Sequence, residues 1–226
     1  MTDAVTVVRL REWAPGSDPV RVVVNAAGRV DLALTDRLHD ETLPRPYATA
    51  RAGSALDAIC FADDLARALL AGSPGAVIAA RKTPAEIAAG FVGRTARLAF
   101  LSPTRFRVAG LDYLLPDPFH LFGGLLDRWQ GLGWPEQIVP NVRRLAAEPE
   151  RLQVEIHRDG PTRRGFVGVV AYDLVGLSAE ERAAAWALLR FGEWRGVGAH
   201  TSYGCGRVRL LRPGETGERA RSAWAA

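Results

Sequence analysis

A glycine-rich segment near the end of the chain, GVGAHTSYGCGRVRLL at 196–211, combines residue types that can bind an anion. Its loop part, 196–206, holds four glycines and four donor side chains and is flanked by two arginines: Gly196, Gly198, Gly204, Gly206, His200, Thr201, Ser202, Tyr203, Arg195 and Arg207. No carboxylate lies between Trp194 and Pro213. Because glycine lets backbone N–H groups approach a ligand closely, this composition favours binding of a phosphate group.

The order of elements around this segment excludes the common nucleotide-binding loops. A dinucleotide-binding loop or P-loop follows a strand and precedes a helix. Here the pattern predicts a helix before the segment and a strand after it, and no Gly-Lys-Ser/Thr ending is present. A second interpretation stays open, in which the glycines only allow a tight connection between a helix and the sheet.

Composition limits the class of protein. The 226 residues carry a net charge of +4, and the basic excess lies in residues 91–226, with 19 basic and 14 acidic side chains. Arginine suits phosphate binding and base stacking, although GC-rich coding also explains its use here. Cys60 and Cys205 show no metal-ligand spacing, which predicts no metal site, and no apolar run is long enough to cross a bilayer. We expect a cytoplasmic protein without a membrane partner.

Apolar spacing and turn residues predict the elements that position this segment. In the first half we expect a strand at 5–11, breakers at 14–19, a helix at 29–39, an extended segment at 43–53, a helix at 62–70 and a strand at 75–81. In the second half we expect a strand at 95–101, a helix capped by Asp117, a strand at 152–156, a hairpin turn at Asp159–Gly160, a strand at 165–172, a helix opened by a Ser178/Glu181 capping box, and a strand at 208–211.

This order is the split βαβ arrangement. We therefore predict an α+β fold of two ferredoxin-like (RRM-like, βαββαβ) modules in tandem, at residues 1–90 and 91–213, followed by a flexible tail at 214–226. Trp129, Trp186 and Phe191 fall at helical spacing and are predicted core residues.

Four stretches resemble the CRISPR-associated repeat-processing endoribonucleases of the repeat-associated (RAMP) superfamily. They are GVGAHTSYGCGRV at 196–208, ARLAFLSPTRF at 96–106, LPDPFHLFGGLLDRW at 115–129 and GFVGVVAYDL at 165–174, and they follow the family's order. The resemblance implies two ferredoxin-like domains that bind CRISPR repeat RNA and cut it once, without metal or cofactor. It also implies that the four glycines and His200 contact or shape the RNA path.

The family often places an active-site histidine ahead of a basic residue and a Pro-aromatic pair. The matching residues here are His39, Arg45 and Tyr47. The resemblance therefore implies that His39 is a general acid or base, that Arg45 neutralises the phosphorane, and that Tyr47 donates a hydrogen bond or stacks under a base. If Asp40 and Glu41 point at His39, they favour its protonated form and hence the acid role; an ordinary solvated helix end is the alternative interpretation.

The chain also departs from that pattern. Many relatives carry a tyrosine upstream of the histidine and use lysine as the cation, whereas no tyrosine precedes Tyr47 here. An RNA-binding subunit of a CRISPR effector complex without cutting activity is therefore a second hypothesis. A small-molecule enzyme that uses the loop for phosphate is a third.

Further residues are candidates for holding the RNA backbone. His200 is predicted first as a phosphate contact and second as a catalytic group. The other candidates are basic side chains outside the loop: Arg143, Arg144, Arg163, Arg164 and His157. For the two arginine pairs, a solvated basic surface is an equally good interpretation.

Overall fold

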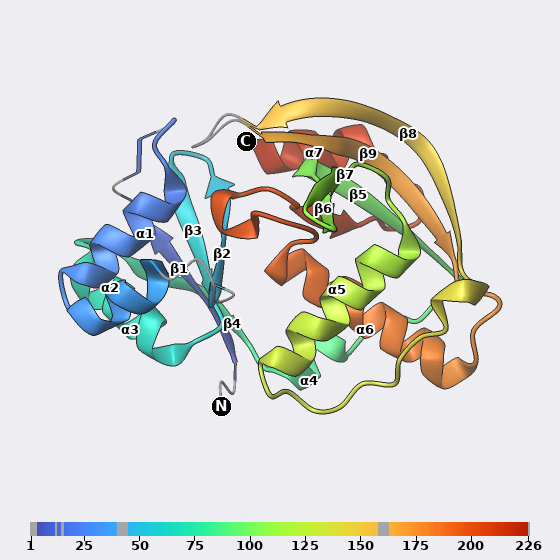
Figure 1. The fold of residues 1–226 in the computed structure, drawn as a ribbon, viewed down its shortest axis with the longest axis horizontal. Coiled ribbons are helices and arrows are strands. Elements are labelled where there is room, and N and C mark those ends of the chain that lie inside the picture. Colours follow the sequence, from blue (N-terminus) through green and yellow to red (C-terminus); the bar gives the residue numbers. More distant parts are fainter. Residues whose placement is uncertain (1–3, 12, 15, 40–44, 158–162, 226) are drawn as a thin grey trace.

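The computed structural model describes residues 4–11, 13–14, 16–39, 45–157 and 163–225. Two antiparallel four-stranded sheets stand side by side, each covered by helices (Figure 1). A two-stranded ribbon projects from the second half, between the first strand and the first helix of that half. The predicted α+β fold of tandem ferredoxin-like modules is confirmed.

The first module has the order βαββαβ, with one helix added. Its elements are β1 (Val5–Leu10), α1 (Pro19–Gly28), α2 (Leu32–His39), β2 (Tyr47–Ala52), β3 (Ala55–Cys60), α3 (Asp63–Gly72) and β4 (Val77–Lys82). The strands are ordered β2-β3-β1-β4. A short helix, α4 (Pro84–Ala88), leads to the second module.

The helix predicted at 29–39 begins three residues later in the structure, at Leu32, and the preceding helix α1 was not predicted. Asp18 caps α1 by accepting hydrogen bonds from the N–H groups of Val20 and Arg21, at 2.9 and 3.4 Å, and Pro19 occupies the first turn. The run APGSDP reads as breakers, yet its last two residues form a helix start. Strand β3 was also missed.

The second module repeats the same order. Its elements are β5 (Thr95–Thr104), the ribbon strands β6 (Phe106–Val108) and β7 (Leu111–Tyr113), α5 (Pro118–Gly131), the 3-10 turn η1 (Val142–Arg144), β8 (Ala146–His157), β9 (Arg163–Asp173), α6 (Ala179–Arg195), the 3-10 turn η2 (Thr201–Tyr203) and β10 (Val208–Leu210). The strands are ordered β10-β5-β9-β8. The hairpin turn predicted at Asp159–Gly160 lies outside the described residues.

Both predicted helix caps of this module are present. Asp117 accepts from the N–H of Phe119 at 2.7 Å, and Ser178 and Glu181 form the reciprocal capping box. The predicted core residues Trp129, Trp186 and Phe191 are buried. The N-termini of α5 and α6 are therefore determined by local sequence.

One hydrophobic core joins the modules. Val5 and Val7 of β1 belong to the cluster that contains the second module's helices, whereas Val8 and Leu10 belong to a separate cluster with α1 and α3. The rings of Phe61 and Phe191 meet edge to face at 6.0 Å across this boundary. Strands β1, β2 and β3 of the first sheet therefore have buried residues on both faces, and the modules share a core.

The expectation of a flexible tail at 214–226 differs from the structure, which has a helix, α7 (Gly217–Ala225), on the outer face of the second sheet (Figure 1). Ala220 is buried with Ala99, Leu101 and Val169. The polar composition hid this contact, because Ala220 is the one buried side chain among those described in α7. Within the described ranges, no helix has the length and apolar character to cross a bilayer.

Candidate nucleic-acid interface

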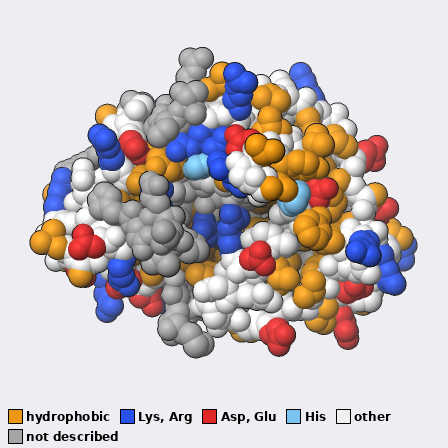
Figure 2. Space-filling model, viewed as in Figure 1, with side chains coloured by type: hydrophobic (Ala, Val, Ile, Leu, Met, Phe, Trp, Pro, Cys, Tyr) orange, Lys and Arg blue, Asp and Glu red, His pale blue; other side chains and the backbone are white. Residues whose placement is uncertain are grey.

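A cleft of about 770 Å³ lies where the first module meets the end of α5 and the glycine-rich loop. Four arginines from four different segments line it: Arg45, Arg128, Arg163 and Arg195. Asp127 is the only acidic residue among its described lining. Figure 2 shows basic side chains and a histidine gathered around a hollow in the middle of this face. The cleft is therefore suited to a polyanion.

The glycines of the loop allow backbone segments to touch. All four have positive φ, between 70° and 83°. A Cβ at Gly198 would lie 2.2 Å from the carbonyl oxygen of Arg105, and one at Gly206 would lie 1.8 Å from that of Val197. These contacts support the interpretation of a tight connection.

The backbone N–H groups of the loop are mostly used inside the protein. The N–H of Val197 donates to Gly206 at 2.8 Å, that of Ala199 donates to Arg105 at 2.8 Å, and that of Gly206 donates to Pro103 at 3.1 Å. The prediction that these N–H groups hold a phosphate was therefore wrong for the three groups. The glycines give the loop its shape, and its side chains face the cleft.

Two buried hydroxyls of η2 hold arginines. Thr201 Oγ1 accepts from Nη1 of Arg195, and Ser202 Oγ accepts from Nη1 of Arg45 at 3.0 Å. Nη2 of Arg195 donates to the carbonyl of Arg45 at 3.3 Å, which closes a network between the modules. Burial, together with the charge of Arg128, lowers the pKa of Arg195 to about 9.

Arg128 is a cleft residue that the sequence analysis missed. Its Nη2 donates to the carbonyl of Gly198, and burial lowers its pKa. A cation in the last turn of a helix is ordinary, because it interacts favourably with the helix dipole. The sequence therefore carried no signal that Arg128 supports the loop.

Tyr203 lies among cations. The guanidinium of Arg163 stands 3.9 Å from its ring centroid, and that of Arg45 stands 5.2 Å away. The ring of His200 meets it at 5.9 Å with an angle of 63° between the planes. The structure thus brings together Arg45, Arg163 and His200, which are far apart in sequence, around one aromatic side chain.

Tyr47 is fully buried in the first module's core, so its ring offers no face to a base. The prediction of stacking was wrong, because β2 turns the ring toward α1 and α3. Tyr47 is among the residues that line the cleft, and its buried hydroxyl has no hydrogen-bond partner in the part of the chain that the structure describes. Burial raises the pKa of this hydroxyl, so it is a neutral donor.

His200 has a left-handed backbone, with φ of 61°. Partial burial lowers its pKa to about 4, with further lowering by Arg163, Arg105 and Arg107 and an opposing effect of Asp112. At neutral pH the imidazole is therefore uncharged in the free protein. This disfavours the predicted contact of a cationic His200 with phosphate.

Three predicted RNA contacts lie elsewhere. Arg207 caps the end of α6, donating from Nη2 and Nη1 to the carbonyls of Glu193 and Trp194 at 2.9 and 3.0 Å, so both terminal nitrogens bond within the fold. Arg143 and Arg144 lie in η1, which contacts the start of α6 through Asn141 and Glu181, whereas the loop follows the end of that helix. Their separation from the cleft follows from the length of α6.

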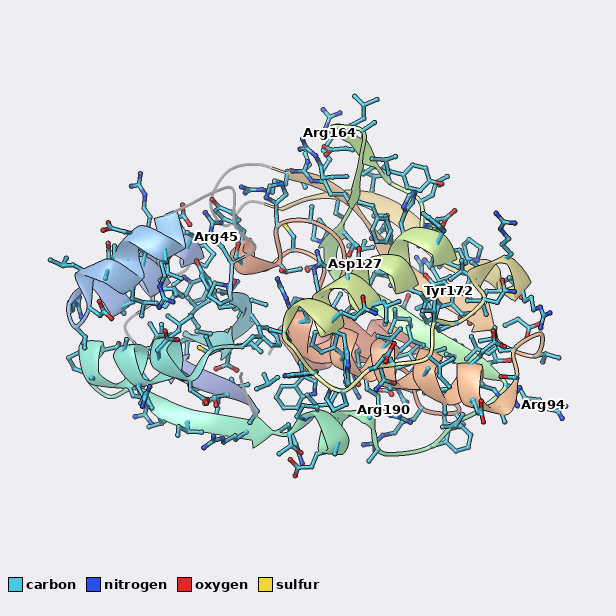
Figure 3. All side chains as sticks on the ribbon, turned by 60° about the horizontal axis from the view of Figure 1, so that its bottom comes forward. Arg45, Arg94, Asp127, Arg164, Tyr172 and Arg190 are labelled. Atoms are coloured by element: carbon cyan, nitrogen blue, oxygen red, sulfur yellow. The ribbon has the colours of Figure 1, made fainter. Side chains whose placement is uncertain are left out.

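Arg164 is exposed and lies apart from the cleft, whereas Arg45 and Asp127 lie on the two sides of the cleft (Figure 3). Arg163, the residue before Arg164, points the other way because successive side chains of a strand alternate. His39 ends α2 and His157 ends β8, but their side chains lie outside what the structure describes.

Comparisons with known proteins agree with this architecture. A Cas6 product complex matches with a TM-score of 0.76 and 24% identity over 92% of this chain and 100% of that chain. A second Cas6 product complex gives 0.73 and 22% over 93% and 100%, and Cas6 of Thermus thermophilus gives 0.69 and 24% over 92% and 97%. At this identity the likeness shows the fold.

The sequence itself carries a family signature. Residues 98–208 match the family model described as CRISPR-associated endoribonuclease Cas6, and no curated protein matches the chain. The matched range runs from β5 to the start of β10 and includes the whole glycine-rich loop. Residues 98–208 therefore carry the signature of the Cas6 family, and the chain has the Cas6 fold.

Proposed function

We propose that this protein is a metal-independent endoribonuclease that cuts CRISPR precursor RNA within its repeats to give guide RNA. The observation that carries the proposal is the cleft, which is lined by arginines from both modules and by Tyr47, whose hydroxyl has no hydrogen-bond partner among the described residues. Similar structures were solved as complexes with product and with a substrate mimic, which supports repeat RNA as the ligand.

The proposed reaction is attack of a 2′-hydroxyl on the adjacent phosphorus. It needs a base for the 2′ proton, an acid for the departing 5′ oxygen, and donors for the crowded phosphorane. The products are a 2′,3′-cyclic phosphate and a 5′-hydroxyl. No cofactor is required for this chemistry.

Arg45 and Tyr47 are the proposed phosphorane donors. Nε of Arg45 and the hydroxyl of Tyr47 are buried and have no hydrogen-bond partner among the described residues. A buried donor without a partner is costly, and a phosphoryl oxygen entering the cleft satisfies both. Their position favours oxygens that carry growing negative charge.

His39 is the proposed group for proton transfer. It directly follows Leu38, which is buried in the same cluster as Tyr47, and Tyr203 packs against that cluster. Imidazole is the side chain suited to proton transfer near neutral pH.

The test is to incubate the protein with its own repeat RNA in EDTA, beside His39→Ala. We expect one cut in the repeat, a cyclic phosphate at the new 3′ end, and loss of cutting in the variant. RNA with a single 2′-deoxy sugar at the cut site is the matched control and should stay intact. Tight binding without any cut by the unsubstituted protein would support instead an inactive RNA-binding subunit.

A further inference from the structure

We propose that His200 is a second catalytic residue, the general base that takes the proton from the attacking 2′-hydroxyl. This inference rests on the proposed function, because it assigns a role within the same cleavage reaction. It leaves the acid role to His39. The loop would then supply chemistry as well as shape.

The first observation is how firmly the fold holds His200 at the cleft. The flanking N–H of Ala199 donates to Arg105 at 2.8 Å, and the carbonyl of His200 accepts from the N–H of Tyr203 at 2.9 Å. Before Ala199, the carbonyl of Gly198 accepts from Arg128. Hydrogen bonds therefore hold the backbone both before and after the imidazole.

The second observation is the backbone conformation itself. A non-glycine residue with φ of 61° costs about 1–2 kcal/mol. The neighbouring positive-φ residues of the loop, Gly198 and Gly204, are glycines, so the imidazole stands where glycine would be less strained. Strain of this kind is retained mainly at functional sites.

The third observation is the charge around the ring. Arg163 faces it from β9, Arg105 follows β5, and Arg107 lies on β6. Among the described residues, the carboxylate that acts on the ring is Asp112 of β7, which forms an ion pair with Arg105 and lies 3.7 Å from Arg107. Partial burial, together with these positive surroundings, keeps the imidazole neutral, so that one ring nitrogen can accept a proton.

Bound RNA changes this balance. Phosphodiester groups in the cleft oppose the charge of the three arginines and so strengthen the imidazole as a base only when substrate is present. In the step itself, the 2′ oxygen bonds to phosphorus and gives its proton to His200. The bond from phosphorus to the 5′ oxygen breaks, and that oxygen takes a proton from His39. Proton exchange with water then removes the proton from His200 and returns one to His39.

The decisive experiment compares two substrates, the natural repeat RNA and the same RNA with sulfur in place of the 5′ oxygen at the cut. A sulfur leaving group needs no acid, so it restores a variant that lacks the acid but not one that lacks the base. The variants are His200→Asn, because asparagine tolerates positive φ, and His39→Ala. His120→Asn, on α5, is the matched control.

We expect His200→Asn to be slowed roughly 10²–10⁴-fold on both substrates. His39→Ala should be slow on the natural RNA and restored on the sulfur substrate, and His120→Asn should cut both normally. Normal cutting by His200→Asn, or its restoration by sulfur, would overturn the inference. If the unsubstituted protein cuts neither RNA, the proposed function fails instead.

Two further measurements separate chemistry from a structural or binding role. His200→Asn should bind uncleavable 2′-deoxy RNA with unchanged affinity, and a loss of affinity that matches the loss of rate would overturn the inference. In the unsubstituted protein, NMR of labelled histidine should show that binding of this RNA makes the His200 ring protonate at higher pH. An unchanged titration would also overturn it, whatever the stability of the variant.

Discussion

The guanidinium of Arg45 donates a hydrogen bond of 3.0 Å to the hydroxyl of Ser202, 157 residues further along the chain. Beside it, Thr49 Oγ1 donates to the backbone carbonyl of Ser202 at 3.0 Å, in a fully buried contact. Strand β2 therefore anchors the glycine-rich loop. The cleft is built across the boundary of the modules, and each module supplies part of it.

Replacing Thr49→Val keeps the shape of the side chain and leaves the carbonyl of Ser202 buried without this donor. We expect a loss of about 1–3 kcal/mol in the free energy of unfolding, measured by urea titration. Thr95→Val, at an exposed strand position, should change it by no more than about 0.5 kcal/mol. Equal effects of the two substitutions would contradict the anchoring role.

Tyr47→Phe should separate catalysis from stability. Its hydroxyl has no partner among the described residues, so its removal should leave the free energy of unfolding unchanged or higher, while cleavage slows about 10²-fold or more. Tyr172→Phe is the converse control, because that hydroxyl donates to Pro116 at 3.1 Å in the core. It should destabilise the protein without slowing cleavage once folded. A stable Tyr47→Phe protein that cuts normally would exclude the donor role.

Gly206→Ala and Gly214→Ala test why the loop needs glycine. Both residues have positive φ, of 70° and 78°, but only Gly206 lacks room for a Cβ. We expect Gly214→Ala to cost about 1–2 kcal/mol, the backbone strain alone, and Gly206→Ala to cost more than twice as much. Chemical denaturation measures both, and similar costs would show that the close contact with Val197 is not required.

Arg163→Met should lower the affinity for RNA and should also make that affinity depend less on salt concentration. If Arg163 contacts one phosphate of single-stranded RNA, the slope of log affinity against log salt falls by about 0.7. Arg94→Met removes the same charge from an exposed position remote from the cleft (Figure 3) and should change the slope less. Filter binding of 2′-deoxy repeat RNA at several salt concentrations gives both slopes, and identical slopes would place the RNA elsewhere.

His200 should also make stability depend on pH. Its pKa is about 4 in the folded protein against an ordinary value of 6.5, so between these values the unfolded chain binds a proton that the folded protein does not. The free energy of unfolding should therefore fall as the pH falls through this window, and His200→Asn should reduce the fall. The ring is partly exposed, which keeps the effect modest. Urea titrations within and above the window measure it, and equal falls in both proteins would contradict it.

Sequence alone predicted the repeated βαββαβ order, because helix caps and apolar periodicity are local signals. Asp117, Ser178 and Glu181 take the capping roles that their spacing indicates. The same rules failed at α1, because the segment that looks like a run of helix breakers also contains the residue that caps this helix. They failed at α7, where the mostly polar sequence gave no sign that Ala220 packs against the second sheet. The predictions succeeded where the local sequence pattern is strong and failed where it is weak.

The candidate site was predictable only as a set of segments. Residue types in the loop indicated anion binding, yet its N–H groups bond within the protein and its glycines serve backbone contacts. Arg195 and Arg207 both flank the loop in sequence, but Arg207 caps α6 whereas Arg195 lines the cleft. Which way a guanidinium points depends on contacts with residues far away in the chain.

What the sequence by itself determined was the order of elements, the family resemblance and the chemical types that the loop carries, since each depends on neighbouring residues. Only the tertiary structure decided that Arg45, Arg128, Arg163 and Arg195 share one cleft, that the ring of Tyr47 is buried, and that His200 is neutral. Burial and electrostatic environment are set by packing between modules, which no local pattern records.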